Sequence, residues 1–203
     1  MLLTLAEVRY LASSVEQQRS CAVGVAPLDL LELLEVLDAP VNDEELVAAA
    51  GFASLVERSI CRPEPSGGVV FTDLEFDACR AALCGADETI RVTLVAPGRV
   101  TFWLVVNGPR RRVVITPVED GRFVVQLLRP DERVRDQIAR LVVSAVCDQP
   151  DSGIAVVRSG PVQAMSLRTS ADFGGVAGSD DARRRAAAAL VAEVFDRGHP
   201  SVA

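Results

Sequence analysis

The stretch "RVTFWLVVNGPRRRVVITPVEDGRFVVQLLRP", residues 99–130, decides the fold. It contains three runs rich in β-branched and aromatic residues, which are the residue types that favour strands. Two turn signals separate these runs: Gly108-Pro109 and Asp120-Gly121, of which Asp-Gly is a strong hairpin signal. A fourth run, residues 90–95, precedes them and ends at Pro97-Gly98, a pair typical of a type II turn. We therefore predict a four-stranded antiparallel meander.

Both faces of this predicted sheet are apolar. Two-residue turns would pair Val118 with Phe123 and Val105 with Arg112, and this register assigns each side chain to a face. One face then carries Ile90, Val92, Leu94, Trp103, Val105, Val114, Val118, Phe123, Val125 and Leu127. The other carries Phe102, Leu104, Val106, Val113, Ile115, Val124 and Leu128, interrupted by Arg91, Thr93 and Gln126. An antiparallel sheet normally presents one polar face to water. We therefore expect the second face to be covered by the chain's own N-terminal helices, by its second hairpin, or by another chain.

Helical patterns lie before and after the meander. Apolar periodicity predicts helices over residues 3–18 and 27–38, and a short helix over residues 42–51 that breaks at Gly51 and continues for one or two turns. Residues 61–68 are predicted as a linker, and Thr72 as the N-cap of the next helix. After the meander, the pattern predicts a helix with a stripe from Val134 to Ala145, a hairpin over residues 153–170, and a last helix capped by Ser179.

These elements predict a single α+β domain over residues 1–203. It consists of a helical N-terminal region (1–86), the four-stranded antiparallel meander with its helix (87–147), and a smaller β-hairpin with the C-terminal helix (148–203). Because a sheet-then-helix order occurs twice, we expect a pseudo-duplicated fold.

Composition limits the classes of function. With 49% hydrophobic residues among 203, the chain is able to bury a core, and its apolar runs are far shorter than the roughly 20 residues that span a bilayer. The first residues lack the basic region of a signal peptide, so we expect a cytoplasmic protein without membrane insertion. The net charge is −7 and every basic residue is Arg, which argues against nucleic-acid binding because an acidic chain repels phosphate backbones.

The residues that usually carry catalysis are scarce. His199 is the only histidine and lies near the C-terminus, the sequence has no Lys, and the five cysteines match no zinc-binding spacing. We therefore predict no catalytic residues, no metal site, no cofactor and no enzymatic activity. One alternative is an enzyme with Cys61 or Cys84 as nucleophile.

Four consecutive segments resemble a known family. They are "LLELLEVLDAPV", "EELVAAAGFASLVERSI", "TDLEFDACRAALCGADETIRVTLV" and the meander with its following helix, which together cover residues 28–146. Their order is similar to that of the N-terminal half of the EspG family, the cytosolic chaperones of actinobacterial type VII (ESX) secretion. The resemblance implies an α+β fold with two related halves. It also implies binding of a helical PE–PPE or WXG100-type substrate through the sheet and the neighbouring helices.

The leading hypothesis is therefore a non-enzymatic, EspG-like chaperone or adaptor whose partner is a helical secretion substrate or a second copy of the chain. A helix would lie against the apolar second face, with an arginine cluster as polar rim. The expected binding residues are Phe102, Leu104, Val106, Ile115 and Leu128 on that face and Arg110, Arg111 and Arg112 at its rim. Two other classes stay open: a regulatory domain that binds a small molecule between sheet and helices near Trp103, and a DNA-binding winged helix.

Overall fold

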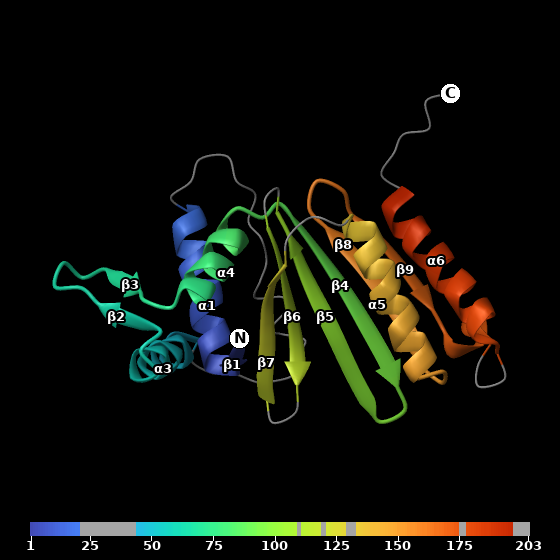
Figure 1. Ribbon diagram of the computed structural model, residues 1–203, viewed down its shortest axis with the longest axis horizontal. Coiled ribbons are helices and arrows are strands. Elements are labelled where there is room, and N and C mark those ends of the chain that lie inside the picture. Colours follow the sequence, from blue (N-terminus) through green and yellow to red (C-terminus); the bar gives the residue numbers. More distant parts are fainter. Residues whose placement is uncertain (21–43, 109–110, 119–120, 129–132, 175–177, 197–203) are drawn as a thin grey trace.

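The predicted meander is confirmed by the structure, a computed structural model that describes residues 1–20, 44–108, 111–118, 121–128, 133–174 and 178–196 (Figure 1). Its strands are β4 (Glu88–Ala96), β5 (Arg99–Asn107), β6 (Arg112–Val118) and β7 (Arg122–Leu128), and each pairs antiparallel with the next. The turn between β4 and β5 contains Gly98 at φ 71°, a conformation that glycine adopts without steric cost.

Three further strands extend the meander to a seven-stranded sheet of order β1-β7-β6-β5-β4-β8-β9. The predicted C-terminal hairpin, β8 (Gly153–Ser159) and β9 (Ala164–Arg168), joins the sheet because β8 pairs with β4. At the other edge, β1 (Leu2–Thr4) pairs with β7 and was not predicted. The first helix, α1 (Leu5–Ser20), therefore begins at Leu5 and not at residue 3, the predicted start.

Helices cover opposite faces of the sheet at opposite ends (Figure 1). On the face of Phe102, α1 and α4 (Leu74–Cys84) pack over β6 and β7 and form a first hydrophobic cluster. On the face of Val105, α5 (Val134–Asp148) and α6 (Asp180–Asp196) pack over β4, β8 and β9 and form a second cluster. The predicted α+β fold is thus correct, with one layer of helices on each face.

The register between β6 and β7 corrects the predicted faces. Val118 pairs with Arg122, so the loop contains three residues (119–121) and ends at Gly121 with φ 66°. A left-handed glycine at this position is typical of three-residue hairpin loops. Because a shift of one residue exchanges the faces of a strand, Phe123, Val125 and Leu127 lie on the face of Phe102, and Val124, Gln126 and Leu128 lie on the opposite face. Between β5 and β6 the shift is two residues, which leaves the faces unchanged.

The helix α3 (Glu44–Glu57) is continuous, so the predicted break at Gly51 is wrong. Gly51 lies where α3 crosses α1, and a Cβ atom there would be 2.0 Å from the carbonyl oxygen of Ala6. The missing side chain lets the two helix backbones approach closely, at the usual cost of glycine inside a helix. This glycine therefore marks a packing contact and not a helix end.

A buried carboxylate joins the same two helices. Glu7 is fully buried, and its oxygens accept hydrogen bonds from the Thr4 N–H (2.8 Å), Ser54 Oγ (2.8 Å) and Arg58 Nη1 (2.7 Å). Burial alone would raise the pKa of the Glu7 carboxyl, but these hydrogen bonds hold the pKa below its ordinary value. Glu7 is therefore charged at neutral pH and ties α3 to the start of α1.

Two predictions around α4 are corrected. The segment 61–68 is not a plain linker, because β2 (Cys61–Pro63) pairs with β3 (Val69–Phe71) in a hairpin that projects from the helices (Figure 1). The N-cap of α4 is Asp73 and not Thr72, since an Asp73 carboxylate oxygen accepts a backbone N–H of the first turn at 2.8 Å.

At the C-terminal end, the predicted N-cap Ser179 is confirmed, because its Oγ accepts the Ala182 N–H at 3.3 Å. The predicted helix over residues 27–38 and His199 lie outside the described residues. Within the described ranges, no helix combines the length and apolar composition that crossing a membrane requires.

Candidate protein-binding surface

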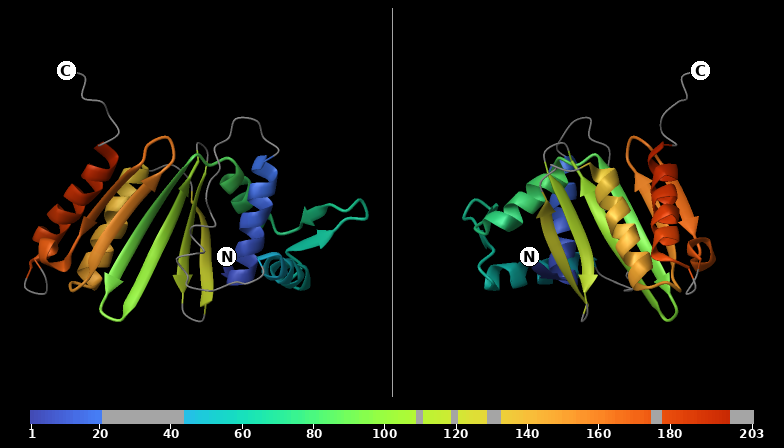
Figure 2. Two further views of the ribbon diagram at one scale, coloured as in Figure 1. Left: turned by 180° about the vertical axis from the view of Figure 1, so that it is seen from behind. Right: turned by 45° about the vertical axis from the view of Figure 1, so that its right-hand side comes forward.

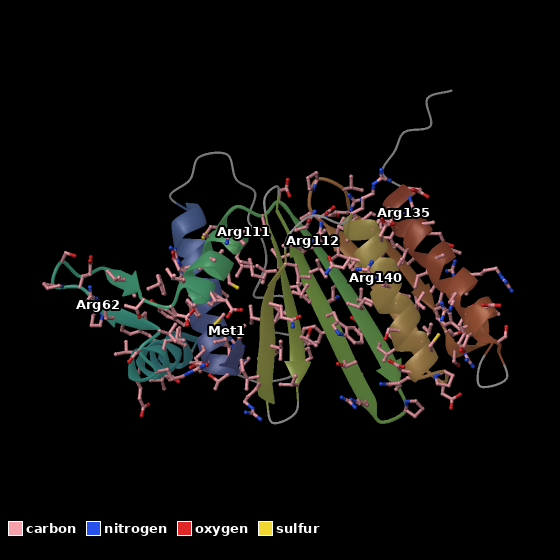
Figure 3. The ribbon with its side chains drawn as sticks, in the orientation of Figure 1. Met1, Arg62, Arg111, Arg112, Arg135 and Arg140 are labelled. Atoms are coloured by element: carbon pink, nitrogen blue, oxygen red, sulfur yellow. The ribbon has the colours of Figure 1, made fainter. Side chains whose placement is uncertain are left out.

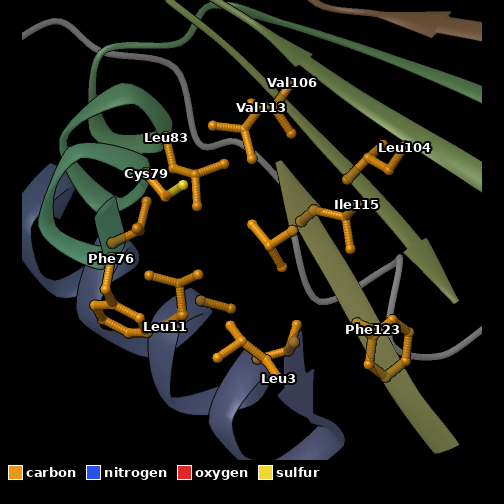
Figure 4. Packing of buried hydrophobic residues seen from close by; sticks show 14 of the residues in the cluster. Leu3, Leu11, Phe76, Cys79, Leu83, Leu104, Val106, Val113, Ile115 and Phe123 are labelled. Carbon is orange, nitrogen blue, oxygen red and sulfur yellow. The ribbon is translucent and has the colours of Figure 1, made fainter. Parts of the chain in front are cut away.

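The apolar residues predicted to bind a partner are mostly buried inside the protein. Phe102, Leu104, Val106 and Ile115 are each at most 3% exposed and belong to the first cluster. Figure 4 shows Leu104, Val106 and Ile115 on the sheet side of this cluster, opposite Leu11 of α1 and Phe76, Cys79 and Leu83 of α4. In this arrangement, a partner has no access to these side chains.

Arg112 is also buried and does not form a polar rim. Its Nε donates to Asn107 Oδ1 (3.0 Å) and its Nη1 to Gln137 Oε1 of α5 (2.8 Å). Asn107 in turn donates to Glu88, which also pairs with Arg158 of β8 at 2.5 Å. This chain of side chains links the second-cluster face of β4, β5, β6 and β8 to α5, so Arg112 stabilises the fold. Leu128 packs against the second cluster, on the face opposite to Phe102.

Arg111 is exposed and lines a shallow groove on the outer side of α4. The groove has a volume of about 470 Å³, and its walls include Leu74, Ala78, Ala81 and Gly108. Figure 3 shows Arg111 beside α4 and Arg112 on the side of α5, although the two residues are adjacent in sequence. The three arginines therefore do not form one cluster; Arg110 lies outside the described residues.

A different part of the sheet is exposed and apolar. On the face of Phe102, side chains of β8, β9 and the adjoining ends of β4 and β5 form a continuous apolar area, which we call the open apolar face: Val95, Val100, Ala155, Val157, Met165 and Leu167. Val100, Met165 and Leu167 are 60%, 62% and 58% exposed. Seen from behind, β8 and β9 lie in front of α5, and no described helix passes over this side of β8 (Figure 2, left).

Besides Ser159 at the end of β8, the polar side chains that interrupt the open apolar face lie along β4. Thr89, Arg91 and Thr93 lie on this side of the strand, with Arg91 opposite Leu104 of β5 and Val157 of β8. Strands β4, β5, β8 and β9 carry no acidic residue on this face. Arg91 is therefore a single cation within an apolar surface.

The opposite corner of the sheet is open as well, but its composition is mixed. On the face of Val105, the strands β1, β6 and β7 carry both polar and apolar residues, which we call the open mixed face: Leu2, Thr4, Thr116, Val118, Arg122, Val124 and Gln126. Leu2 and Val118 are 39% and 38% exposed. This corner has the composition of an ordinary solvent-facing sheet.

Two of the described cysteines, Cys61 and Cys79, lie in environments that disfavour the thiolate. Cys61 and Cys79 are buried in the first cluster; burial raises the pKa of the Cys61 thiol, and burial followed by the nearby Glu75 raises the pKa of Cys79 to about 11. A nucleophilic cysteine needs a lowered pKa, so these environments oppose thiolate formation. Among the described residues, no three His, Cys, Asp or Glu side chains are arranged to hold a metal ion.

Comparisons with known proteins identify no family: no family model and no curated protein matches this sequence.

The open apolar face was not predicted from the sequence, although the sequence contains a signal for it. Residues 153–168 are apolar at both alternating positions of β8, with Ile154 and Val156 on one side and Ala155 and Val157 on the other. Such a strand requires cover on both faces.

Proposed function

We propose that the chain is a non-enzymatic protein-binding adaptor whose partner covers the open apolar face. The observation that carries the proposal is the exposure of Val100, Met165 and Leu167 beside half-buried Val157 on one uncovered side of the sheet. Contiguous exposed apolar surface is a common sign of an interaction site. Where other parts of the same sheet are apolar, helices cover them, so a helix of a partner fits this position in the same way.

The similarity to the EspG family suggests the class of partner. Under this proposal the partner is a helical type VII secretion substrate of the PE–PPE or WXG100 type, and the chain acts in the cytoplasm. The four described cysteines are free, which is consistent with a reducing compartment.

A small-molecule function has less support. The alternative required a site between the sheet and the helices near Trp103, but Trp103 packs against the second cluster. The groove at Arg111 lies on the outer side of α4, and among its described lining residues only Asp77 and Arg111 are charged.

The experiment is a pull-down with purified PE–PPE pairs and WXG100-type proteins, followed by size-exclusion chromatography. We expect the wild type to capture a helical substrate, and the double variant Met165→Glu/Leu167→Glu to lose it. The matched control is Gln126→Glu, which adds a charge to the open mixed face and should leave capture unchanged. Absence of capture by the wild type, or capture that survives the double variant, would contradict the proposal.

A further inference from the structure

Arg91 is the feature of the open apolar face that packing alone does not explain. It lies in the middle of β4, between Leu104 and Val157 on the neighbouring strands. Its Nε atom is buried, and among the described residues no acceptor lies within hydrogen-bonding distance of it. Arg91 is nevertheless half-buried overall, so part of the residue reaches the surface.

The buried Nε donor of Arg91 has no acceptor among the described residues. Arginine stays protonated in proteins, so it cannot avoid the cost of a buried cation by losing its proton. Nearly all buried donors in folded proteins have a hydrogen-bond partner, and an unsatisfied one costs free energy. Since this face of β4, β5, β8 and β9 carries no acidic residue, a carboxylate partner for Arg91 has to come from outside these strands.

Resting on the proposed function, we propose that Arg91 selects partner helices that carry a carboxylate inside their apolar stripe. The apolar residues of such a helix contact Val157, Met165 and Leu167, and its Glu or Asp forms a bidentate pair with the Arg91 guanidinium. Charge-assisted pairs of this kind are short, directional and stronger than neutral hydrogen bonds. A helix with an uncharged stripe would cover Arg91 and leave it unsatisfied, which discriminates against that helix.

The same charge argues against a second copy of the chain stacked face to face. Such a dimer would bring two Arg91 side chains together in an apolar interface. The strands β4, β5, β8 and β9 of neither copy would place an acidic residue in that interface. Like charges at close range in an interface are strongly unfavourable. A helical partner with one acidic residue satisfies both the apolar area and the cation.

The test uses a displayed library of amphipathic helices in which one position of the apolar stripe is randomised, selected against the wild type and against Arg91→Gln. We expect Glu or Asp to be enriched at that position with the wild type only. For a selected peptide, the Glu-to-Gln change should weaken binding to the wild type about 30-fold, and should have little effect on Arg91→Gln. Arg91→Glu should in turn favour the same peptide with Arg at that position.

The outcomes separate the two proposals. If helices are selected and lost with Met165→Glu/Leu167→Glu, but carry no acid and bind Arg91→Gln equally well, the role of Arg91 is refuted while the docking surface stands. If no helix binds in a manner that depends on Met165 and Leu167, both proposals fail. A wild-type dimer by light scattering that the double variant abolishes would assign the face to a second copy and overturn the inference. Circular dichroism of Arg91→Gln verifies that the variant is folded.

Discussion

The open apolar face and the open mixed face lie at opposite ends and on opposite sides of one sheet, yet they expose different residues. At the mixed end, Thr4, Arg122 and Gln126 separate apolar residues that are less than two-fifths exposed. At the apolar end, Met165 and Leu167 are about three-fifths exposed, and Val157 and Ala155 lie beside them. Both ends lack a described helix, so the absence of cover does not by itself explain the apolar composition. The difference is the one that the proposed function requires, with one end composed for water and the other left apolar for the proposed partner.

The largest effect is expected for Gly51→Ala, which tests the close crossing of α3 with α1, the helix that covers one end of the sheet. Inside an exposed helix this change stabilises, but here the new Cβ atom would meet the Ala6 carbonyl oxygen at 2.0 Å. We expect a loss of about 3 kcal/mol or more in the free energy of unfolding, measured by urea denaturation. Gly85→Ala is the matched control, since its Cβ would have ordinary contacts and it should change stability by less than about 0.5 kcal/mol. Equal effects of the two changes would mean that α1 and α3 do not cross closely.

A pair of changes on β8 tests the contrast between covered and open faces directly. Val156 is fully buried in the second cluster, whereas its neighbour Val157 lies on the open apolar face. We expect Val156→Ala to lower the free energy of unfolding by about 2–3 kcal/mol, and Val157→Ala by less than about 1 kcal/mol. If Val157→Ala proves as costly as Val156→Ala, the face is already covered within the protein.

Glu7→Gln tests the charged hydrogen bonds that join α1 to α3 at the covered end of the sheet. At neutral pH we expect a loss of about 1–3 kcal/mol, because a buried carboxylate that accepts hydrogen bonds from three residues becomes a neutral amide. The folded-state pKa of Glu7 is lowered, so its contribution is present above the unfolded-state pKa of about 4.3 and is lost as the pH falls through the folded-state value. Urea titrations from about pH 7 to about pH 3 should therefore show a weaker pH dependence for Glu7→Gln than for the wild type. If the free energy of unfolding depends on pH in the same way in both proteins, the Glu7 carboxylate does not contribute to stability as proposed.

The smallest effect is expected at the open mixed face. Gln126 is exposed on β7, so Gln126→Glu should change the free energy of unfolding by less than about 0.5 kcal/mol. Partner capture should also stay unchanged. A loss of capture in this variant, measured in the pull-down described above, would show that the mixed end also binds and that the contrast between the two ends is not functional.

The sequence predicted the meander and the α+β class because alternating β-branched residues and glycine turns are local signals. It did not predict β1, since the pairing of Leu3 with Phe123 is a long-range contact that no local pattern contains. The face assignment of β7 failed for a narrow reason: a loop of three residues instead of two exchanges both faces of a strand.

The candidate site was predicted less well than the fold. The sequence indicated that the second face needed cover, but it could not determine that α1 and α4 bury Ile115 and Val106 while leaving Met165 and Leu167 open. That distinction depends on which end of the sheet each helix covers, which is a property of tertiary packing. The unsatisfied donor of Arg91 likewise depends on its neighbours in three dimensions.

The pairing of β1 with β7 has a consequence for synthesis of the chain. Leu3 and Phe123 pair with each other although they are 120 residues apart in the sequence. At translation rates of about 5–20 residues per second, the ribosome needs about 6–24 s to make the partner strand after β1 has been made. During this interval α1 has no sheet on which to bury Val8 and Leu11. Helix α1 is therefore made many seconds before the sheet on which it packs is complete, and the part of its apolar side that faces β7 stays uncovered during this time.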